Sequence, residues 1–116
     1  MSVNGHLSRD AILGSSDLPT REVDIPEWGG PVLIRTMTGG ERDRFEAEFK
    51  RDPSTDLRAR LAVACLCDDG GQLLFTPADI PALTAKSSRA LDRIFAAATI
   101  HNGITDKDVE ELRKNS

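Results

Sequence analysis

The sequence predicts an α+β fold that is mostly α-helical, with one N-terminal β-hairpin packed on four or five short helices. Three observations predict it. Apolar and polar residues alternate over residues 21–37, as in strands with one buried face. From Thr38 onward, helix-start signals and helically spaced apolar residues follow. Only 4% of residues are aromatic, so Leu, Ile, Val and Ala must fill the core, which favours small, closely packed helices.

The length of 116 residues suits one domain with its own hydrophobic core. We expect a short leading helix and linker over residues 1–19, with Ser8 as the N-cap and Gly14 as the terminator. A single globular domain is expected over residues 20–104. A charged C-terminal helix or tail should occupy residues 105–116, and we expect it to be frayed or unpacked because it contains few apolar residues.

The two strands of the hairpin each place apolar side chains on one face. Val23 and Ile25 point one way on the first strand, and Val32 and Ile34 share a face on the second. An isolated two-stranded hairpin is marginally stable in water. The apolar face therefore needs helices beneath it.

The tip of the hairpin contains the only tryptophan of the chain, Trp28. Pro26 and Pro31 flank the tip and cannot donate hydrogen bonds to a sheet. We therefore expect pairing to lapse there and the loop to be wide. Trp28 in such a loop has two readings that do not exclude each other: a plug at the end of the core, or an exposed anchor for a partner, since tryptophan is enriched at binding hot spots.

The predicted helices begin at recognisable caps. Thr38 and Glu41 form a capping box, and Thr76 with Asp79 marks another start. The segment after Arg60 is apolar nearly all round, as in a central buried helix. The helices after the hairpin are expected at about 39–51, 54–67, 77–84 and 87–101.

Composition and charge exclude several functions. The net charge of −4 and a pI near 5.1 disfavour nucleic-acid binding, which usually needs a basic face. The longest apolar run, Leu61–Cys67, is far shorter than the roughly 20 residues that span a bilayer, and the first twenty residues lack a secretory signal. We therefore expect no nucleic acid or membrane partner and a cytoplasmic location.

Candidate chemical motifs all have simpler structural explanations. Cys65 and Cys67 would point about 200° apart on a helix, at about 100° per residue, so they should be buried structural thiols. The stretch "DDGG" lacks the ligand spacing of a calcium loop, and "TGGE" lacks the lysine of a phosphate loop. With only His6 and His101 as histidines, a catalytic triad is also unsupported. We predict no enzyme activity, no cofactor and no metal.

Three stretches carry a resemblance to a known family. They are "VDIPEWGG" (residues 23–30), "TGGERDRFE" (38–46) and "DGGQLLFTPAD" (69–79). With these motifs the chain resembles, over about residues 11–112, the tail assembly chaperones of long-tailed, siphovirus-type bacteriophages and prophages. This resemblance implies a mainly helical, oligomeric protein that binds and solubilises the tape measure protein and helps recruit tail tube subunits.

The resemblance also implies that the protein acts in the host bacterial cytoplasm and is not retained in the mature virion. Many such proteins have a longer, frameshifted form; the codons for "RKN" (residues 113–115) are a candidate slippage site, with a solvated tail as the alternative. We expect Trp28, Phe45 and Phe49 to bind the partner, because they are the large side chains nearest to polar sequence that should be exposed. The alternative function is a small structural tail or connector subunit of a phage particle.

Overall fold

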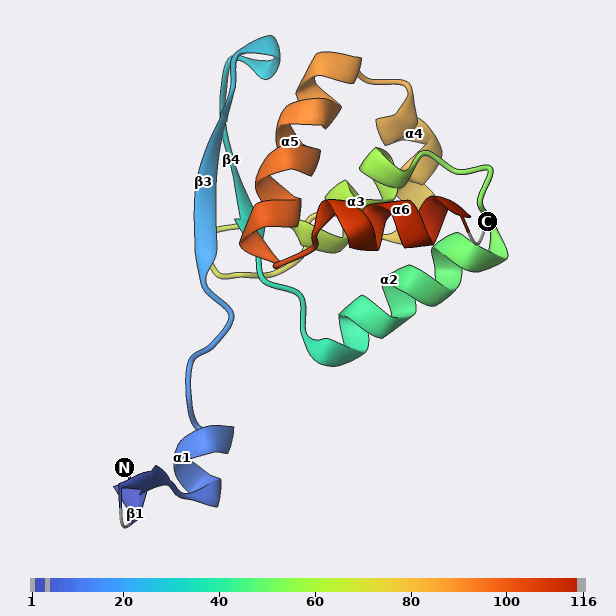
Figure 1. The fold of residues 1–116 in the computed structure, drawn as a ribbon. Coiled ribbons are helices and arrows are strands. Elements are labelled where there is room, and N and C mark those ends of the chain that lie inside the picture. Colours follow the sequence, from blue (N-terminus) through green and yellow to red (C-terminus); the bar gives the residue numbers. More distant parts are fainter. Residues whose placement is uncertain (1, 4, 115–116) are drawn as a thin grey trace.

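A small antiparallel sheet lies beside a group of helices, and a slender N-terminal segment extends from one end (Figure 1). This computed structural model describes residues 2–3 and 5–114; residues 115–116 of the predicted tail lie outside the described residues. The mostly helical α+β fold predicted from the sequence is confirmed. In chain order, the elements are β1 (Ser2–Val3), β2 (His6–Leu7), α1 (Arg9–Leu13), β3 (Thr20–Ile25), η1 (Pro26–Trp28), β4 (Gly30–Arg35), α2 (Gly39–Arg51), α3 (Leu57–Cys65), β5 (Leu66–Cys67), η2 (Pro77–Asp79), α4 (Ile80–Thr84), α5 (Ser88–His101) and α6 (Asp106–Lys114).

Strands β3 and β4 form the predicted hairpin, and its apolar face is the buried one: Ile25 and Ile34 are fully buried. The pairing continues to Ile25 opposite Gly30, so the expected lapse of pairing near the tip is wrong. Pro31 is tolerated opposite Asp24 because β5 pairs only with residues 33–34 of β4. Pro31 lacks a backbone N–H, and because β5 does not extend along this part of β4, no hydrogen bond from that position is needed.

A third strand, β5, was not predicted. Leu66 and Cys67 pair antiparallel with Ile34 and Leu33 of β4, so α3 ends at Cys65 instead of continuing to Cys67. Periodicity cannot distinguish a buried helix from a buried strand in a continuous apolar run. Pairing with β4 decides where this run leaves the helical conformation.

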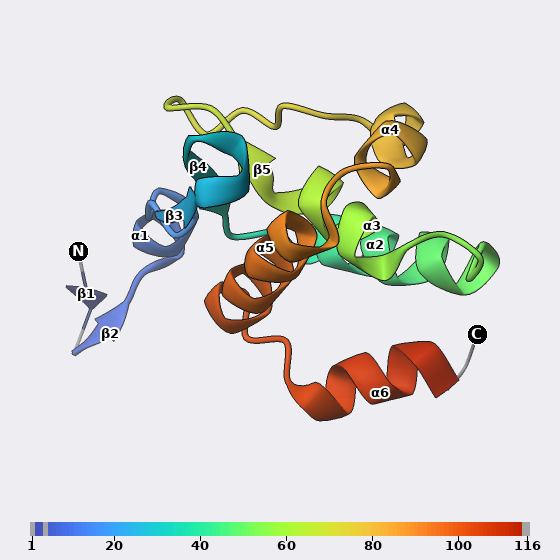
Figure 2. The same ribbon diagram turned by 90° about the horizontal axis from the view of Figure 1, so that it is seen from above.

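The helices cover one face of the sheet in two layers. Helix α5 packs against β3 and β4, and α3 packs against α5 with α2 and α4 at its sides (Figures 1 and 2). Helix α3 is buried on nearly every side, as predicted for the central helix. Only Arg58 and Ala64 of this helix are half-buried, because neighbouring helices surround it.

Helix α6 is packed, so the expectation of a frayed or unpacked C-terminal helix is wrong. It contacts α2, and Leu112 is buried with only 5% of its surface exposed. Val109 and Leu112 line, together with Phe45 and Ile104, the same apolar contact region. Two apolar residues suffice because Phe95 of α5 and residues Leu57 and Leu61 of α3 complete this apolar surface.

Polar contacts hold the base of the hairpin, opposite its tip, to the end of α5. The backbone N–H of Thr36 donates to the carbonyl oxygen of Pro19 at 3.2 Å, and His101 Nε2 lies 2.9 Å from the same oxygen. The backbone N–H of Met37 donates to Asn102 Oδ1 at 2.7 Å. These contacts hold Pro19 against the helical body of the molecule.

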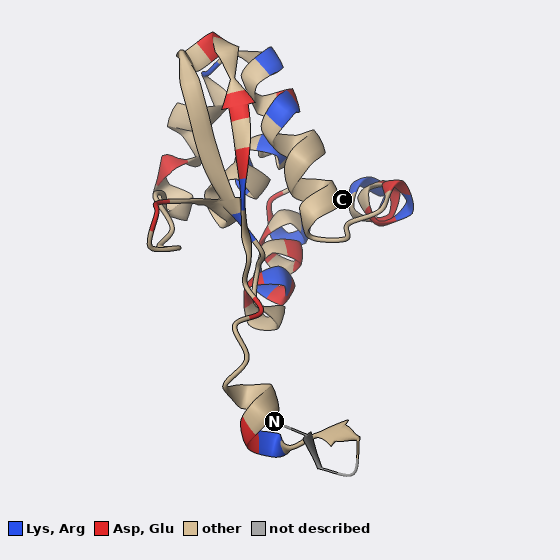
Figure 3. Cartoon of the chain, turned by 90° about the vertical axis from the view of Figure 1, so that its left-hand side faces the viewer, with Lys and Arg blue, Asp and Glu red and all other residues tan. Residues whose placement is uncertain are grey.

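Residues 5–18 form a segment that we call the arm. It projects from the base of the hairpin away from the helices (Figures 1 and 3). The predicted leading helix is present as α1, with the Ala11 N–H donating to Ser8 Oγ at 3.1 Å, and it has no buried residue. The short β1–β2 pairing before it was not predicted.

Candidate partner-binding groove

An apolar hollow opens between the turn of the hairpin and helix α4. Its volume is about 530 Å³, which falls within the roughly 300–1,000 Å³ typical of binding pockets. Apolar side chains supply most of its lining, with one acid and one lysine among them. The lining residues are Trp28, Phe75, Asp79, Ala82, Leu83 and Lys86.

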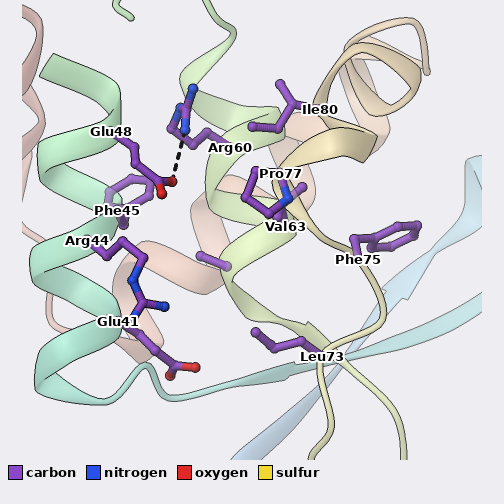
Figure 4. A pocket seen from close by; sticks show the side chains of 11 residues that line it. Glu41, Arg44, Phe45, Glu48, Arg60, Val63, Leu73, Phe75, Pro77 and Ile80 are labelled. Carbon is purple, nitrogen blue, oxygen red and sulfur yellow. Dashed lines mark hydrogen bonds and ion pairs between the residues drawn. The ribbon is translucent and has the colours of Figure 1, made fainter. Parts of the chain in front are cut away.

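A second, smaller hollow of about 100 Å³ lies between α2, α3 and the segment that precedes α4 (Figure 4). Its apolar lining includes Phe45, Val63, Leu73, Phe75, Pro77 and Ile80. Phe75 lines both hollows, so the two adjoin. We call them together the Trp28–Phe75 groove.

The turn that carries Trp28 is fixed in place by local and tertiary contacts. Gly29 adopts a left-handed φ of +77°, which glycine does without a steric penalty, and its N–H donates to the Pro26 carbonyl at 3.1 Å. Arg93 Nε on α5 donates to the Glu27 carboxylate at 2.9 Å. This hydrogen bond holds the pKa of Glu27 below its ordinary value. The turn is thus tied to the body beneath it.

Trp28 combines the two roles that its sequence context left open. It is half-buried and packs against the hydrophobic core, as a plug would. It also lines the outer hollow, as an anchor would. The ring is therefore held by the core while part of it stays accessible from the groove.

The two phenylalanines of α2 are not exposed, so the exposure expected from the polar sequence around them is wrong, while their part in partner binding stays a prediction. Phe45 and Phe49 retain only 5% and 4% of their surface, because α3 and α6 pack against α2. Both belong to the core cluster, but Phe45 also lines the inner hollow and Phe49 does not. The residues that sequence reasoning missed are Phe75 and Leu83. Their apolar character was visible, but the short segments around them had no helical or strand period.

Charged residues of both signs surround the inner hollow. Arg60 is buried with 8% exposed, and its Nη1 and Nε donate to Glu48 Oε2 at 3.3 Å and Thr55 Oγ1 at 3.1 Å. A buried cation is costly without such partners. The pair with Glu48 neutralises Arg60, so this wall of the groove carries no uncompensated buried charge.

Glu41 lies at the opposite side of the inner hollow and also has partners. Burial raises the pKa of Glu41, but hydrogen bonds from the Thr38 N–H at 2.8 Å and from Arg35 Nη2 at 2.6 Å outweigh it and leave the pKa below its ordinary value. Glu41 is therefore ionised at neutral pH. With Arg44 exposed beside it, the rim presents both charge signs around an apolar floor.

The prediction that Cys65 and Cys67 are buried thiols is confirmed. Burial raises the pKa of Cys65 to about 12, so this thiol stays protonated at neutral pH. Within the described residues there is no group of three or more His, Cys, Asp or Glu side chains that could hold a metal ion. No helix in the described part of the chain is both long and apolar enough to cross a membrane.

The fold is similar to that of a solved structure, the tail assembly chaperone of bacteriophage HK97. The two superpose with a TM-score of 0.58 over 79% of this chain and 88% of that chain, with 20% sequence identity. The chain shares the fold of that chaperone. No protein-family model and no curated protein matches the sequence, so the similarity rests on the three-dimensional arrangement.

Proposed function

We propose that this protein is a phage tail assembly chaperone that binds a helical segment of the tape measure protein in the Trp28–Phe75 groove. The observation that carries the proposal is an apolar groove on a fold shared with the HK97 tail assembly chaperone. In this role the protein is not an enzyme. It keeps the tape measure protein soluble in the host cytoplasm, helps recruit tail tube subunits, and is absent from the mature virion.

The chemistry of the groove suits an amphipathic helix. Such a helix places its apolar residues three and four positions apart, and a groove with an apolar floor and polar rim receives that face. The groove offers Trp28 and Phe75 as aromatic contacts, and the rim offers both carboxylates and guanidinium groups. A tape measure protein is a long helical molecule whose apolar stripes would aggregate if left uncovered.

The three residues expected to bind the partner take different parts in this proposal. Trp28 contacts the partner directly from the hairpin turn. Phe45 forms the floor of the inner hollow, where only a small part of its ring is accessible. Phe49 acts indirectly, because it holds α2 against the core.

The test is to measure binding of tape measure segments, taken from the very long helical reading frame expected immediately downstream of this gene. Isothermal titration calorimetry would compare the natural chain with Trp28→Ala. We expect the affinity to fall by at least about tenfold, as for an interface hot spot, and the melting temperature to fall much less. The control is Ile100→Ala, an exposed apolar residue with 73% of its surface accessible, which should leave the affinity unchanged.

Two outcomes would contradict the proposal. If Trp28→Ala lowers the melting temperature as severely as it lowers the affinity, Trp28 serves only the core. No binding of any tape measure segment by the natural chain would remove the function itself.

The alternative function, a structural tail or connector subunit, predicts that the protein remains in the finished phage particle. Mass spectrometry of purified particles would detect a structural subunit in a fixed ratio to the other tail proteins. The chaperone role predicts its absence from those particles. A longer frameshifted product, if made, would be seen in lysates with the same antibody and would be the form that contacts tail tube subunits.

A further inference from the structure

The rim of the Trp28–Phe75 groove carries two cations without an ion-pair partner. Arg44 of α2 lines the inner hollow, and Lys86, just after α4, lines the outer hollow. Both residues are exposed. Within the part of the chain that the structure describes, neither side chain forms an ion pair. Each charge is therefore available to a molecule that enters the groove.

The carboxylates around the inner hollow are already neutralised by the protein itself. Glu41 accepts from Arg35 Nη2 at 2.6 Å, and Glu48 accepts from Arg60 Nη1 at 3.3 Å. Figure 4 shows Glu41, Arg44 and Glu48 together on the α2 side of this hollow. Because each of these acids has its own guanidinium partner, Arg44 is the charge in excess on this side.

The acids near the outer hollow are also engaged. Asp79 is half-buried, and its Oδ2 accepts from the Thr76 N–H at 2.9 Å in the cap that begins η2. Glu27, in the hairpin turn, is paired with Arg93 at 2.9 Å. Lys86 is thus the charged group of the outer hollow that is left with no contact to a carboxylate among the described residues.

We propose that the helical segment bound in the groove is acidic, with aspartate or glutamate residues at the edges of its apolar stripe that meet Arg44 and Lys86. This inference rests on the proposed function and names the chemistry of its partner. The apolar face of the segment enters the two hollows, as an amphipathic helix does in a groove. A carboxylate beside each cation forms a charge-assisted hydrogen bond, whereas a lysine or arginine there meets an unpaired positive charge.

The net charge of the chain, −4, makes this preference selective. Averaged over its whole surface, the protein repels an acidic segment. Such a segment is favoured only where unpaired cations lie beside exposed apolar side chains, and the groove is such a place. Complementary charges contribute to orientation and to the exclusion of wrong partners more than to raw affinity. The two cations therefore fix the register of the segment, while the apolar lining supplies the contact area.

Two designed peptides test the preference directly. Both are amphipathic helices with the same apolar residues and no tryptophan, and they differ only in having glutamate or lysine beside the apolar stripe. Trp28 is the only tryptophan of the chain and lines the groove, so its fluorescence reports binding there. At low ionic strength we expect the glutamate peptide to bind about tenfold more tightly than the lysine peptide. The difference should narrow at about 1 M salt, which screens exposed charges.

Charge reversal tests whether the two cations cause the preference. Arg44→Glu and Lys86→Glu should each weaken binding of the glutamate peptide by about three- to tenfold, and the double variant should prefer the lysine peptide. The matched control is Lys50→Glu, which makes the same change of charge at an exposed position of α2 that lines neither hollow. It should leave both affinities within about twofold of the natural values.

Three outcomes overturn the proposal. The first is that the natural chain binds the two peptides equally or prefers the lysine peptide. The second is that the preference for glutamate survives both charge reversals, because other cations would then cause it. The third is that neither peptide binds, because the groove would then accept no amphipathic helix of either charge.

The two proposals fail separately. Tape measure segments whose affinity is unchanged when their acidic residues are replaced by glutamine support the proposed function and overturn the acidic preference. Loss of affinity on that replacement, measured in the natural chain but not in the double variant Arg44→Glu with Lys86→Glu, supports both proposals. A preference for the glutamate peptide without binding of any tape measure segment supports the charge selection by the groove and overturns the proposed function.

Discussion

The helices α1 and α2 begin with the same chemistry and end in different environments. Ser8 caps α1 and Thr38 caps α2, each accepting from the backbone N–H three residues on. Helix α2 buries Phe45 and Phe49, whereas α1 buries nothing. The caps set where each helix begins, but an isolated helix of this length is marginal in water. Burial in the body is what supports α2, and α1 has no such support within one chain.

The comparison divides the molecule into a body that holds the fold and an arm that is available for contacts. The strongest way to examine this division is to make the same substitution in both. Ile94 is fully buried in α5, and Ile12 is 54% exposed in α1. We expect Ile94→Ala to lower the free energy of unfolding by about 2–5 kcal/mol, because it removes buried methyl groups and leaves a cavity.

Ile12→Ala should change that free energy by less than about 0.5 kcal/mol, as surface substitutions do. Urea denaturation followed by circular dichroism, in solution dilute enough for the monomer to predominate, measures both. A large loss for Ile12→Ala would mean that the arm contributes to the folded body.

The two caps give a smaller but more direct contrast. Thr38→Ala should lower the free energy of unfolding by about 1 kcal/mol, since it removes the acceptor for the Glu41 N–H at 3.0 Å. Ser8→Ala removes the equivalent acceptor in α1 and should leave the global transition unchanged. Equal effects in thermal and urea denaturation would show that α1 and α2 unfold as one unit.

The smallest expected effect on the free energy of unfolding at neutral pH comes from the buried thiol of Cys65. Burial raises the pKa of Cys65 to about 12, well above the ordinary value of about 9, so the unfolded chain releases this proton at a lower pH than the folded chain. The stabilisation is fully present below pH 9 and is lost as the pH rises toward 12.

Urea denaturation at several pH values between 8 and 11 would measure this loss. In the Cys65→Ala variant, the stability should fall less steeply over the same range. Identical slopes in the two proteins would show that the thiol of Cys65 does not cause the alkaline loss.

Local chemistry was sufficient to predict those features whose causes are neighbours in sequence. The alternation that includes Val23 and Ile25 gave the buried face of the hairpin, because side chains of a strand alternate between faces. The capping box of Thr38 and Glu41 gave the start of α2, and both of its hydrogen bonds are present. The tryptophan between Pro26 and two glycines marked the turn that lines the candidate groove.

Features that depend on distant segments were missed. Strand β5 exists because Leu66 meets Ile34 of the hairpin, and nothing in the local apolar run indicates that meeting. The burial of Phe45 depends on α6, which begins some sixty residues later in the chain. The polar sequence around Phe45 and Phe49 suggested that they are exposed, but α3 and α6 pack against α2 and cover them.

The sequence by itself determined the local elements, the identity of the apolar faces and the fold class, because hydrogen-bonding caps, proline restrictions and side-chain periodicity act over a few residues. Only the tertiary structure decided which apolar side chains are covered and which remain open. Burial depends on segments that meet from far apart in the chain, such as α2 with α6, or the hairpin turn with the loop that carries Phe75. The groove and the uncovered arm are both products of that long-range packing.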